Sequence, residues 1–257
     1  MKILIIIPAH NEEKRISATL ENYASFFNKF MKKNYEILVI LNGCKDNTLK
    51  IVKETAKKYK TIKFKNYIES GKGFAIMEGF KEALKHKTEL IGFVDADNAT
   101  SPGAFYDLIK NINIYDGIIA SRYVKGAIVR PKQSIQRTIA SRVFNILVRV
   151  LFIMPYHDTQ CGAKIFKKDA LEKILPKITT SNWAFDVDLL YKAKKSKLKI
   201  KEYPTIWQDK TGSKLDLKKA SIQMLFAAIR LRMLNSKLKR IWWIFKPVSG
   251  IVWRTAR

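Results

Sequence analysis

Two carboxylates stand one residue apart at Asp95-Ala96-Asp97, directly after the aliphatic run of residues 90–94. Alternate residues of an extended chain point to the same side, so both carboxylates can face one ion. Carboxylate oxygens are hard ligands that suit Mg²⁺ or Mn²⁺. Acidic residues are also common loop formers at strand ends, so the meaning of this pair depends on its surroundings.

Basic and glycine residues elsewhere have the chemistry to bind anions. Gly71-Lys72-Gly73 allows the backbone to approach a phosphate, with Lys72 as a counter-charge, although it is also a plausible flexible turn before a helix. Arg122, which follows Ser121, and Arg137 carry guanidinium groups that suit phosphate oxygens. The alternative for each arginine is an ordinary surface position.

Two further acids lie in segments that indicate burial. Asp158 begins the polar run Asp158-Thr159-Gln160-Cys161-Gly162, and Asp186 stands between Phe185 and Val187. A buried carboxylate is costly unless it serves a metal, a base role or a hydrogen-bond network. For Asp186 the alternative is an ordinary position at a helix N-terminus.

The hydrophobic pattern of the first half predicts strands that alternate with helices. Aliphatic runs predict strands at residues 2–7, 35–41, 61–66 and 90–94, and helical spacing predicts helices at 12–30, after 46 and after 73. This alternation is typical of a mostly parallel sheet with helices on both faces. Ligands of such sheets sit at the carboxyl ends of the strands. We therefore expect Ala9-His10-Asn11, Asn42-Gly43 and Asp95-Ala96-Asp97 to converge on one crevice, with His10 lining it.

The second half mixes apolar and basic residues. It predicts strands at residues 117–122 and 200–207, a helix at 182–194, and a long apolar segment at 134–154. Residues 217–257 contain ten Lys or Arg residues, no acid and several tryptophans. Basic residues among aromatic ones suit an interfacial element on an anionic membrane. We expect part of 220–234 to pack as an ordinary helix, 241–253 to contact membrane, and 134–154 to form a second lipid-facing element.

The net charge, the cysteine content and the lengths of the apolar runs limit the classes of protein to which the chain can belong. The formal charge of +27 over 257 residues favours polyanionic partners such as nucleic acid, anionic lipid or phosphorylated substrates, or else a solvated basic surface without a partner. No RNP-type aromatic motif, zinc spacing or helix-turn-helix supports a specific nucleic-acid partner. The two cysteines, Cys44 and Cys161, indicate reduced thiols. Neither a signal peptide nor an apolar span of about 18–20 residues is visible.

Taken together, the motifs resemble the inverting glycosyltransferases of family 2, which have a nucleotide-binding GT-A fold. The resemblance begins with Ile7-Pro8-Ala9-His10-Asn11-Glu12-Glu13, Gly71-Lys72-Gly73 and Val94-Asp95-Ala96-Asp97. Later segments are similar to dolichyl-phosphate β-glucosyltransferases and related polyprenyl-phosphate sugar synthases. These are Asp158-Thr159-Gln160-Cys161-Gly162, residues 183–190, Gly212-Ser213-Lys214, Ser221-Ile222-Gln223-Met224 and Ile229-Arg230-Leu231-Arg232. The family usually has Asp-Asp-Gly-Ser where this chain has Leu41-Asn42-Gly43-Cys44.

The resemblance implies an α/β GT-A domain over residues 1–215 and a basic segment of C-terminal amphipathic helices over 216–257. It implies transfer of a hexose from a nucleotide-sugar to a polyprenyl or dolichyl phosphate, with Asp97 and Asp95 holding Mg²⁺ or Mn²⁺. Arg122, Arg137 and Ser121 would bind the acceptor phosphate, and Asp158 and Asp186 would line the sugar or acceptor side. The nucleotide would be lined by Pro8, Ala9, Asn11, Glu12, Asn42, Lys72, Asp95 and Ala96.

Several alternatives remain open from the sequence. The acidic pair that helps to bind the nucleoside in relatives is replaced at Leu41-Asn42, which leaves the donor base open. UDP is the first choice of donor nucleotide and GDP the second. A mannosyltransferase using GDP-mannose or a transferase to a saccharide acceptor are the nearest enzymatic alternatives. A catalytically silent membrane scaffold and a polyanion-binding protein are the alternatives of another class. The expected location is the cytoplasmic face of a membrane, as a peripheral protein.

Overall fold

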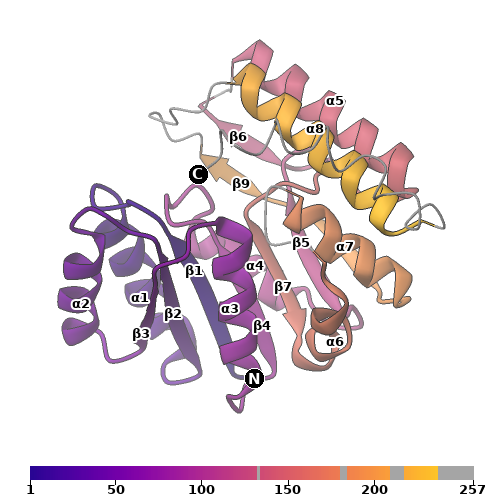
Figure 1. The fold of residues 1–257 in the computed structure, drawn as a ribbon. Coiled ribbons are helices and arrows are strands. Elements are labelled where there is room, and N and C mark those ends of the chain that lie inside the picture. Colours follow the sequence, from indigo (N-terminus) through magenta and orange to yellow (C-terminus); the bar gives the residue numbers. More distant parts are fainter. Residues whose placement is uncertain (132–133, 180–183, 209–216, 237–257) are drawn as a thin grey trace.

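A seven-stranded sheet forms the centre of the computed structural model, which describes residues 1–131, 134–179, 184–208 and 217–236, with the backbone alone for 217–222. The strand order is β3-β2-β1-β4-β7-β5-β8, and Figure 1 labels all of these strands except β8. All neighbours are parallel except β7, which is antiparallel to both β4 and β5. The strands of this sheet are β1 (Ile3–Ala9), β2 (Tyr35–Asn42), β3 (Ile62–Tyr67), β4 (Leu90–Val94), β5 (Gly117–Ser121), β7 (Ala163–Lys167) and β8 (Ile200–Pro204).

Helices cover both faces of this sheet. Their bounds are α1 (Ile16–Met31), α2 (Thr48–Lys58), α3 (Lys72–Leu84), α4 (Pro102–Lys110), α6 (Lys168–Ile174) with the 3₁₀ turn η1 (Leu175–Lys177), and α7 (Phe185–Lys195). Alternate residues of β1 point to opposite faces, so Ile3 and Ile5 pack with α1 and α4, whereas Leu4 and Ile6 pack with α3 and α7. Every residue of β1 is buried, as the unbroken aliphatic run predicts for a central parallel strand.

Two long helices form a separate layer beside the sheet. α5 (Ile135–Phe152) and α8 (Leu217–Leu234) lie side by side in Figure 1, and β6 (Ile128–Arg130) pairs with β9 (Ile206–Gln208) in a small second sheet near them. Val148 and Phe152 of α5, Leu190 of α7 and Leu231 of α8 share a third hydrophobic cluster. In the part of the chain that the structure describes, no helix is both long and apolar enough to cross a bilayer.

The mostly parallel α/β sheet expected from the sequence is confirmed, and two expectations about its elements were wrong. The helix expected from residue 12 begins at Ile16, because the backbone N–H groups of Glu12 and Glu13 donate to Thr48 and Asp46 side chains instead. The strand expected over 200–207 is divided at Thr205 into β8 and β9, which belong to different sheets. The apolar segment 134–154, to which the sequence assigned no secondary structure, contains the amphipathic helix α5. The strand β7 and helices α4 and α6 were not expected.

Some expectations concern residues outside the described ranges. They are the membrane contact proposed at 241–253, and two segments of the family resemblance that include Gly212-Ser213-Lys214 and Trp183. The division of the chain at residue 215 also falls there. α8 follows it and packs against α5, as expected for part of 220–234.

Candidate active site

A pocket of about 220 Å³ opens where β1, β2 and β4 end. These strands are neighbours in the sheet, so the three strand ends expected to converge do meet there. Six of the eight residues expected to line the nucleotide line this pocket. Its lining consists of Pro8, His10, Glu12, Asn42, Lys72, Asp95, Ala96 and Asp97. The other two expected residues lie beside it, since Ala9 is buried in the core and the Asn11 carboxamide accepts a hydrogen bond from Lys45 N.

The Asn42 side chain forms hydrogen bonds to two other segments that border the pocket. Its Nδ2 donates to the carbonyl oxygen of Ala9 at 2.9 Å, and its Oδ1 accepts from Gly71 N at 3.0 Å. The Gly71 turn, with a φ of +136°, begins α3 and so places Lys72 over the pocket. Leu41 is a core residue. Leu41-Asn42, which replaces the two acids of the resembled family, therefore presents no carboxylate to the pocket. Asn42 instead links the end of β1 to the start of α3 through its hydrogen bonds.

Asp95 is paired with Lys72 across this pocket. The Lys72 ammonium nitrogen lies 2.5 Å from Asp95 Oδ1, and both side chains are partly exposed. A cation beside a strand-end carboxylate in a concave, polar site can hold the oxygens of a diphosphate. Lys72 therefore supplies positive charge at the place where the sequence predicts a phosphate.

Asp97 is the second, partly buried carboxylate of this pocket. Its Oδ1 accepts a hydrogen bond from Ala99 N at 2.9 Å. Burial, together with the negative charge of Asp95, raises the pKa of the Asp97 carboxyl above its usual range. A divalent cation would relieve this repulsion, and two carboxylates are suitable hard ligands for one.

The donor set nevertheless provides only part of a coordination sphere. In the described ranges of the chain, no three His, Cys, Asp or Glu side chains gather as a metal site. An ion bound by Asp95 and Asp97 would take its remaining ligands from a bound molecule, and diphosphate oxygens have the required chemistry.

Gly162 is a residue of this site to which the sequence gave no role. A Cβ at this position would stand 1.8 Å from Asp95 Oδ2 and 2.3 Å from its Cγ. The residue directly precedes β7, which pairs with β4 and so brings the loop of Asp158 to Gly162 against the end of β4. Only glycine leaves room for the carboxylate of Asp95 in its present position.

Changing Gly162 to alanine is expected to reduce transfer by about a hundredfold, because the methyl group must displace the Asp95 carboxylate by an ångström or more. Initial rates of sugar transfer, with nucleotide affinity from calorimetry, measure the effect. Gly103→Ala is the control, since a Cβ there meets only the Phe26 ring at 3.8 Å. Equal rates for the two variants would contradict this role of Gly162.

Two buried ion pairs involve Asp158 and Lys164, which lie on either side of Gly162 in the sequence. Arg122 Nε and Nη2 donate to Asp158 Oδ2 and Oδ1 at 2.7 and 2.9 Å, with Asp158 fully buried and the Arg122 side chain 10% exposed. The Lys164 ammonium, also fully buried, donates to Asp186 Oδ1 at 2.6 Å and to the Cys161 carbonyl at 2.7 Å. The structure thus places Asp158 and Asp186 in ion pairs, and Lys164 is a partner that the sequence did not indicate.

The guanidinium of Arg122 belongs to a cluster of cations and rings. Its carbon lies 5.3 Å from the ring centroids of both Tyr123 and Trp207, and Arg142 of α5 lies 5.1 Å from the Tyr123 ring. The Tyr123 hydroxyl donates to Ser141 Oγ at 2.7 Å, which ties α5 to this cluster. Two of the five guanidinium N–H groups of Arg122 are directed at Asp158.

The other two residues predicted to bind an acceptor phosphate lie at the ends of elements near this cluster. Ser121 is the last residue of β5, is buried, and accepts a hydrogen bond from Tyr123 N at 3.4 Å. Arg137 lies in the first turn of α5, where its backbone N–H donates to the Ser134 cap. Neither side chain lines the pocket of Asp95 and Asp97.

Comparison with known proteins gives consistent results. The sequence model of glycosyl transferase family 2 matches residues 4–175. A dolichyl-phosphate beta-glucosyltransferase of Dictyostelium discoideum is 35% identical over 244 residues, covering 89% of this chain and 73% of that protein. The protein of the same name from Saccharomyces cerevisiae is 33% identical over 253 residues, with coverages of 89% and 73%.

Solved structures show the same fold. The glucosyl-3-phosphoglycerate synthase of Mycobacterium tuberculosis, in complex with Mn²⁺, UDP and glucosyl-3-phosphoglycerate, is similar with a TM-score of 0.66. The match covers 90% of this chain and 79% of that chain at 14% sequence identity. At this identity the likeness concerns the fold alone.

Proposed function

The chain belongs to glycosyltransferase family 2 and is a hexosyltransferase with the GT-A fold, and from this premise we propose that it transfers glucose from a UDP-linked donor to a polyprenyl or dolichyl phosphate, with inversion. The observation that carries the proposal is the pocket at the ends of β1, β2 and β4, where Lys72, Asp95 and Asp97 meet. The similarity to dolichyl-phosphate beta-glucosyltransferases over most of the chain supports the choice of acceptor.

On the donor side, the chain's residues bind and hold the nucleotide diphosphate. The nucleotide would occupy the space lined by Pro8, Glu12, Asn42 and Ala96, and the Lys72 ammonium at this pocket would bind the diphosphate oxygens. Burial raises the pKa of the Glu12 carboxyl, although hydrogen bonds and charge from Arg15 oppose this. Asp97 and Asp95 would hold a Mg²⁺ or Mn²⁺ ion, which, when bound, offsets negative charge on the leaving diphosphate.

On the acceptor side, the nucleophile is an oxygen of the lipid phosphate. It attacks the anomeric carbon while the bond from that carbon to the donor phosphate oxygen breaks, and the nucleoside diphosphate departs. The acceptor phosphate is already anionic near neutral pH, so the reaction needs positioning and charge stabilisation more than a strong general base. Arg122, Arg137 and Ser121 are proposed to position this phosphate, with Asp158 and Asp186 supporting that side through their ion pairs.

The reaction is tested by incubating the protein with a polyprenyl phosphate and a panel of nucleotide-sugars, with Mg²⁺ or Mn²⁺, and by analysing the lipid fraction by mass spectrometry. We expect a hexosyl-phosphate lipid with UDP-glucose. Product from GDP-mannose alone would replace the donor that we propose, and a product only with saccharide acceptors would refute the lipid acceptor.

Replacing Arg137 with alanine is expected to raise the concentration of polyprenyl phosphate needed for half-maximal rate by about tenfold or more, because a charge-assisted contact to phosphate is lost. The requirement for nucleotide-sugar should stay nearly constant. Lys57→Ala, which removes a charge from the exposed face of α2, is the control. If only donor binding weakens in Arg137→Ala, the assignment to the acceptor is wrong.

A lipid-linked acceptor brings the enzyme to a membrane. We propose a peripheral location on a cytoplasmic membrane face, which agrees with the formal charge of +27.

A further inference from the structure

The outer face of α5 carries a line of exposed aliphatic side chains. Five residues of α5, and Ile153 directly after its last residue, are between 57% and 78% exposed: Ile135, Ile139, Val143, Ile146, Val150 and Ile153. Their spacing of three and four residues places them on one side of the helix, over its whole length of about 27 Å. We call these six residues the α5 stripe.

The opposite side of α5 is fixed to the protein, so the stripe is held outward. Asn145 Oδ1 accepts hydrogen bonds from Thr159 N and Oγ1 at 2.9 and 3.0 Å. Val148 and Phe152 are buried in the cluster shared with α7 and α8. The exposure of the stripe is therefore a property of a helix anchored on its other face, and not of a poorly packed one.

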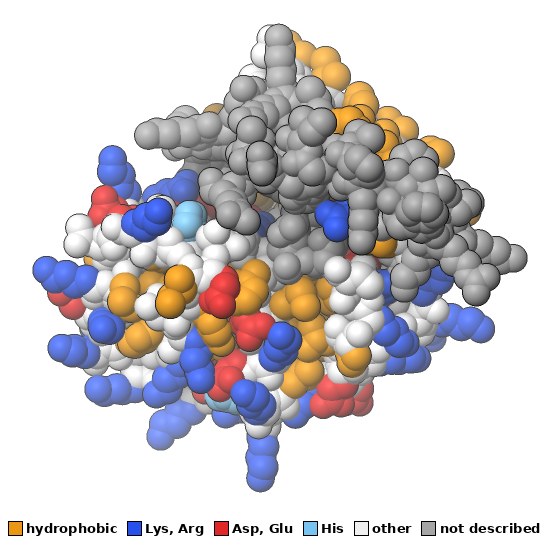
Figure 2. Space-filling model, in the orientation of Figure 1, with side chains coloured by type: hydrophobic (Ala, Val, Ile, Leu, Met, Phe, Trp, Pro, Cys, Tyr) orange, Lys and Arg blue, Asp and Glu red, His pale blue; other side chains and the backbone are white. Residues whose placement is uncertain are grey.

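The apolar surface continues beyond the stripe. Phe226 and Ile229 of the neighbouring α8 are also exposed. Figure 2 shows hydrophobic side chains along the upper right edge of the molecule, where Figure 1 places α5 and α8. An apolar surface of this extent on a chain of this size marks an interaction site.

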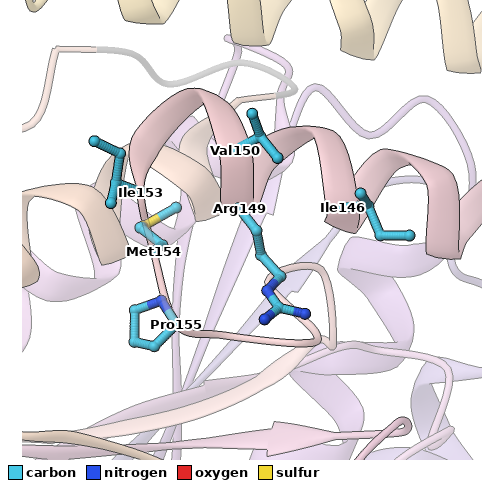
Figure 3. A pocket seen from close by; sticks show the side chains of 6 residues that line it. All are labelled: Ile146, Arg149, Val150, Ile153, Met154 and Pro155. Atoms are coloured by element: carbon cyan, nitrogen blue, oxygen red, sulfur yellow. The ribbon is translucent and has the colours of Figure 1, made fainter.

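A pocket of about 420 Å³ lies at the C-terminal end of the stripe. It is lined by Ile146, Arg149, Val150, Ile153, Met154 and Pro155 (Figure 3). Aliphatic side chains with one guanidinium beside them match the chemistry of an acyl chain with an anionic headgroup. Arg142, seven residues before Arg149, lies on the same side of α5 and reaches the ring of Tyr123.

The positive charge of α5 and α8 indicates which kind of partner contacts the α5 stripe. The sequences of α5 and α8 contain Arg137, Arg142, Arg149, Lys218, Lys219, Arg230 and Arg232 but no acid. A second copy of the chain would bring the same positive side chains against this face. Since each copy carries a formal net charge of +27, their repulsion disfavours self-association. A bilayer with anionic headgroups offers both an apolar layer and negative charge.

We infer that the α5 stripe, with the exposed residues of α8 beside it, is the surface by which this protein lies on an anionic membrane. α5 lies in the plane of the interface, with its aliphatic side chains in the acyl region and Arg142 and Arg149 at the level of the headgroups. This inference deepens the proposed function and rests on it in one respect, since the Arg122 and Arg142 cluster would then face a lipid phosphate at the membrane surface.

Vesicle flotation tests this surface without any sugar transfer. The full chain is mixed with vesicles of phosphatidylcholine and phosphatidylserine that contain neither polyprenyl phosphate nor nucleotide-sugar. The double variant Ile146→Gln/Val150→Gln is expected to bind about tenfold more weakly than the unchanged protein, because two aliphatic side chains no longer enter the acyl region. Vesicles of phosphatidylcholine alone should bind weakly.

The matched control is Ile68→Gln/Ile114→Gln, which removes two exposed isoleucines far from α5 in the sequence. We expect it to bind vesicles as the unchanged protein does. Equal binding by the stripe variant, or equal loss by the control variant, would overturn the inference.

Two other occupants of the stripe give distinct results. If deletion of residues 237–257 increases vesicle binding, that segment covers the stripe, and the inference fails. If the unchanged protein is a dimer in solution and the stripe variant a monomer, a second copy covers it, and the inference also fails. A failure of transfer in detergent, with vesicle binding as expected, would refute the proposed function and leave this surface intact.

Discussion

Replacing Asp97 with asparagine is expected to lower the rate of sugar transfer by about a hundredfold to a thousandfold while the protein stays folded. The carboxamide keeps the shape of the side chain but loses the negative charge that would hold a divalent cation at the leaving diphosphate. A loss of several kcal/mol of charge stabilisation corresponds to this range of rate. Rates at saturating donor, with metal titrations, measure the effect.

The matched control for this change is Asp107→Asn. Asp107 is an exposed carboxylate on α4 that pairs with Lys110 at 2.8 Å, away from the pocket. Its variant should transfer sugar at the normal rate. If Asp97→Asn retains normal activity and normal metal-dependent nucleotide binding, the assignment of Asp97 to the metal is wrong.

The pKa of Asp97 adds a dependence on pH. Burial and the charge of Asp95 raise this pKa, so protons compete with a cation over a range higher than for an ordinary aspartate. Affinity for Mn²⁺ should therefore fall as the pH decreases through the raised pKa, and in that pH range binding should release a proton. In Asp97→Asn this part of the pH dependence should be absent, which calorimetry in buffers of different ionisation enthalpy can measure.

Replacing Asp158 with asparagine is expected to reduce the free energy of unfolding by about 3–5 kcal/mol. The change leaves the Arg122 guanidinium buried without its counter-charge, and removing one partner of a buried pair costs about this much. Urea unfolding followed by fluorescence measures the change. Asp107→Asn breaks an exposed pair and should cost less than about 1 kcal/mol.

The same variant should alter the response of stability to acid. Burial alone would raise the pKa of the Asp158 carboxyl, but the charge and hydrogen bonds of Arg122 outweigh this and lower it. A carboxyl with a lowered pKa contributes stability above its unfolded pKa and loses it as the pH falls through the folded pKa. Asp158→Asn should therefore show a flatter loss of stability in acid. A cost below about 1 kcal/mol would mean that the pair contributes little.

The fold of the first half of the chain could be predicted well, because its strands and helices follow from patterns within short stretches of sequence. Unbroken aliphatic runs define β1, β2 and β4, and parallel strands place their ends together. The pocket lining of Pro8, Asn42, Asp95 and Asp97 follows from this rule. Ala9 was expected to line the nucleotide, but its side chain is buried in the core and does not line the pocket.

The second half could not be predicted equally well because its interactions are distant in sequence. Lys164, the second residue of β7, is unusual in a buried strand, and its ammonium is accommodated by the Cys161 carbonyl and by Asp186, which lies 22 residues later. Asp158 and Arg122 are 36 residues apart, so no spacing reveals that they pair. The role of Gly162 depends on the approach of Asp95, which only the pairing of β4 with β7 creates.

The antiparallel strand β7 also has a consequence for how such a chain can change. It separates β1 to β4, of which β1, β2 and β4 end at the pocket of Asp95 and Asp97, from β5 and β8, which lead to the arginine cluster and α5. With the roles that we propose for the two sides, substitutions on the β5 side would alter the acceptor without disturbing the pocket of Asp95 and Asp97, provided that Gly162 and Lys164 at the junction are kept. We expect exchange of residues 112–157 between relatives to transfer acceptor preference while leaving nucleotide preference with residues 1–111.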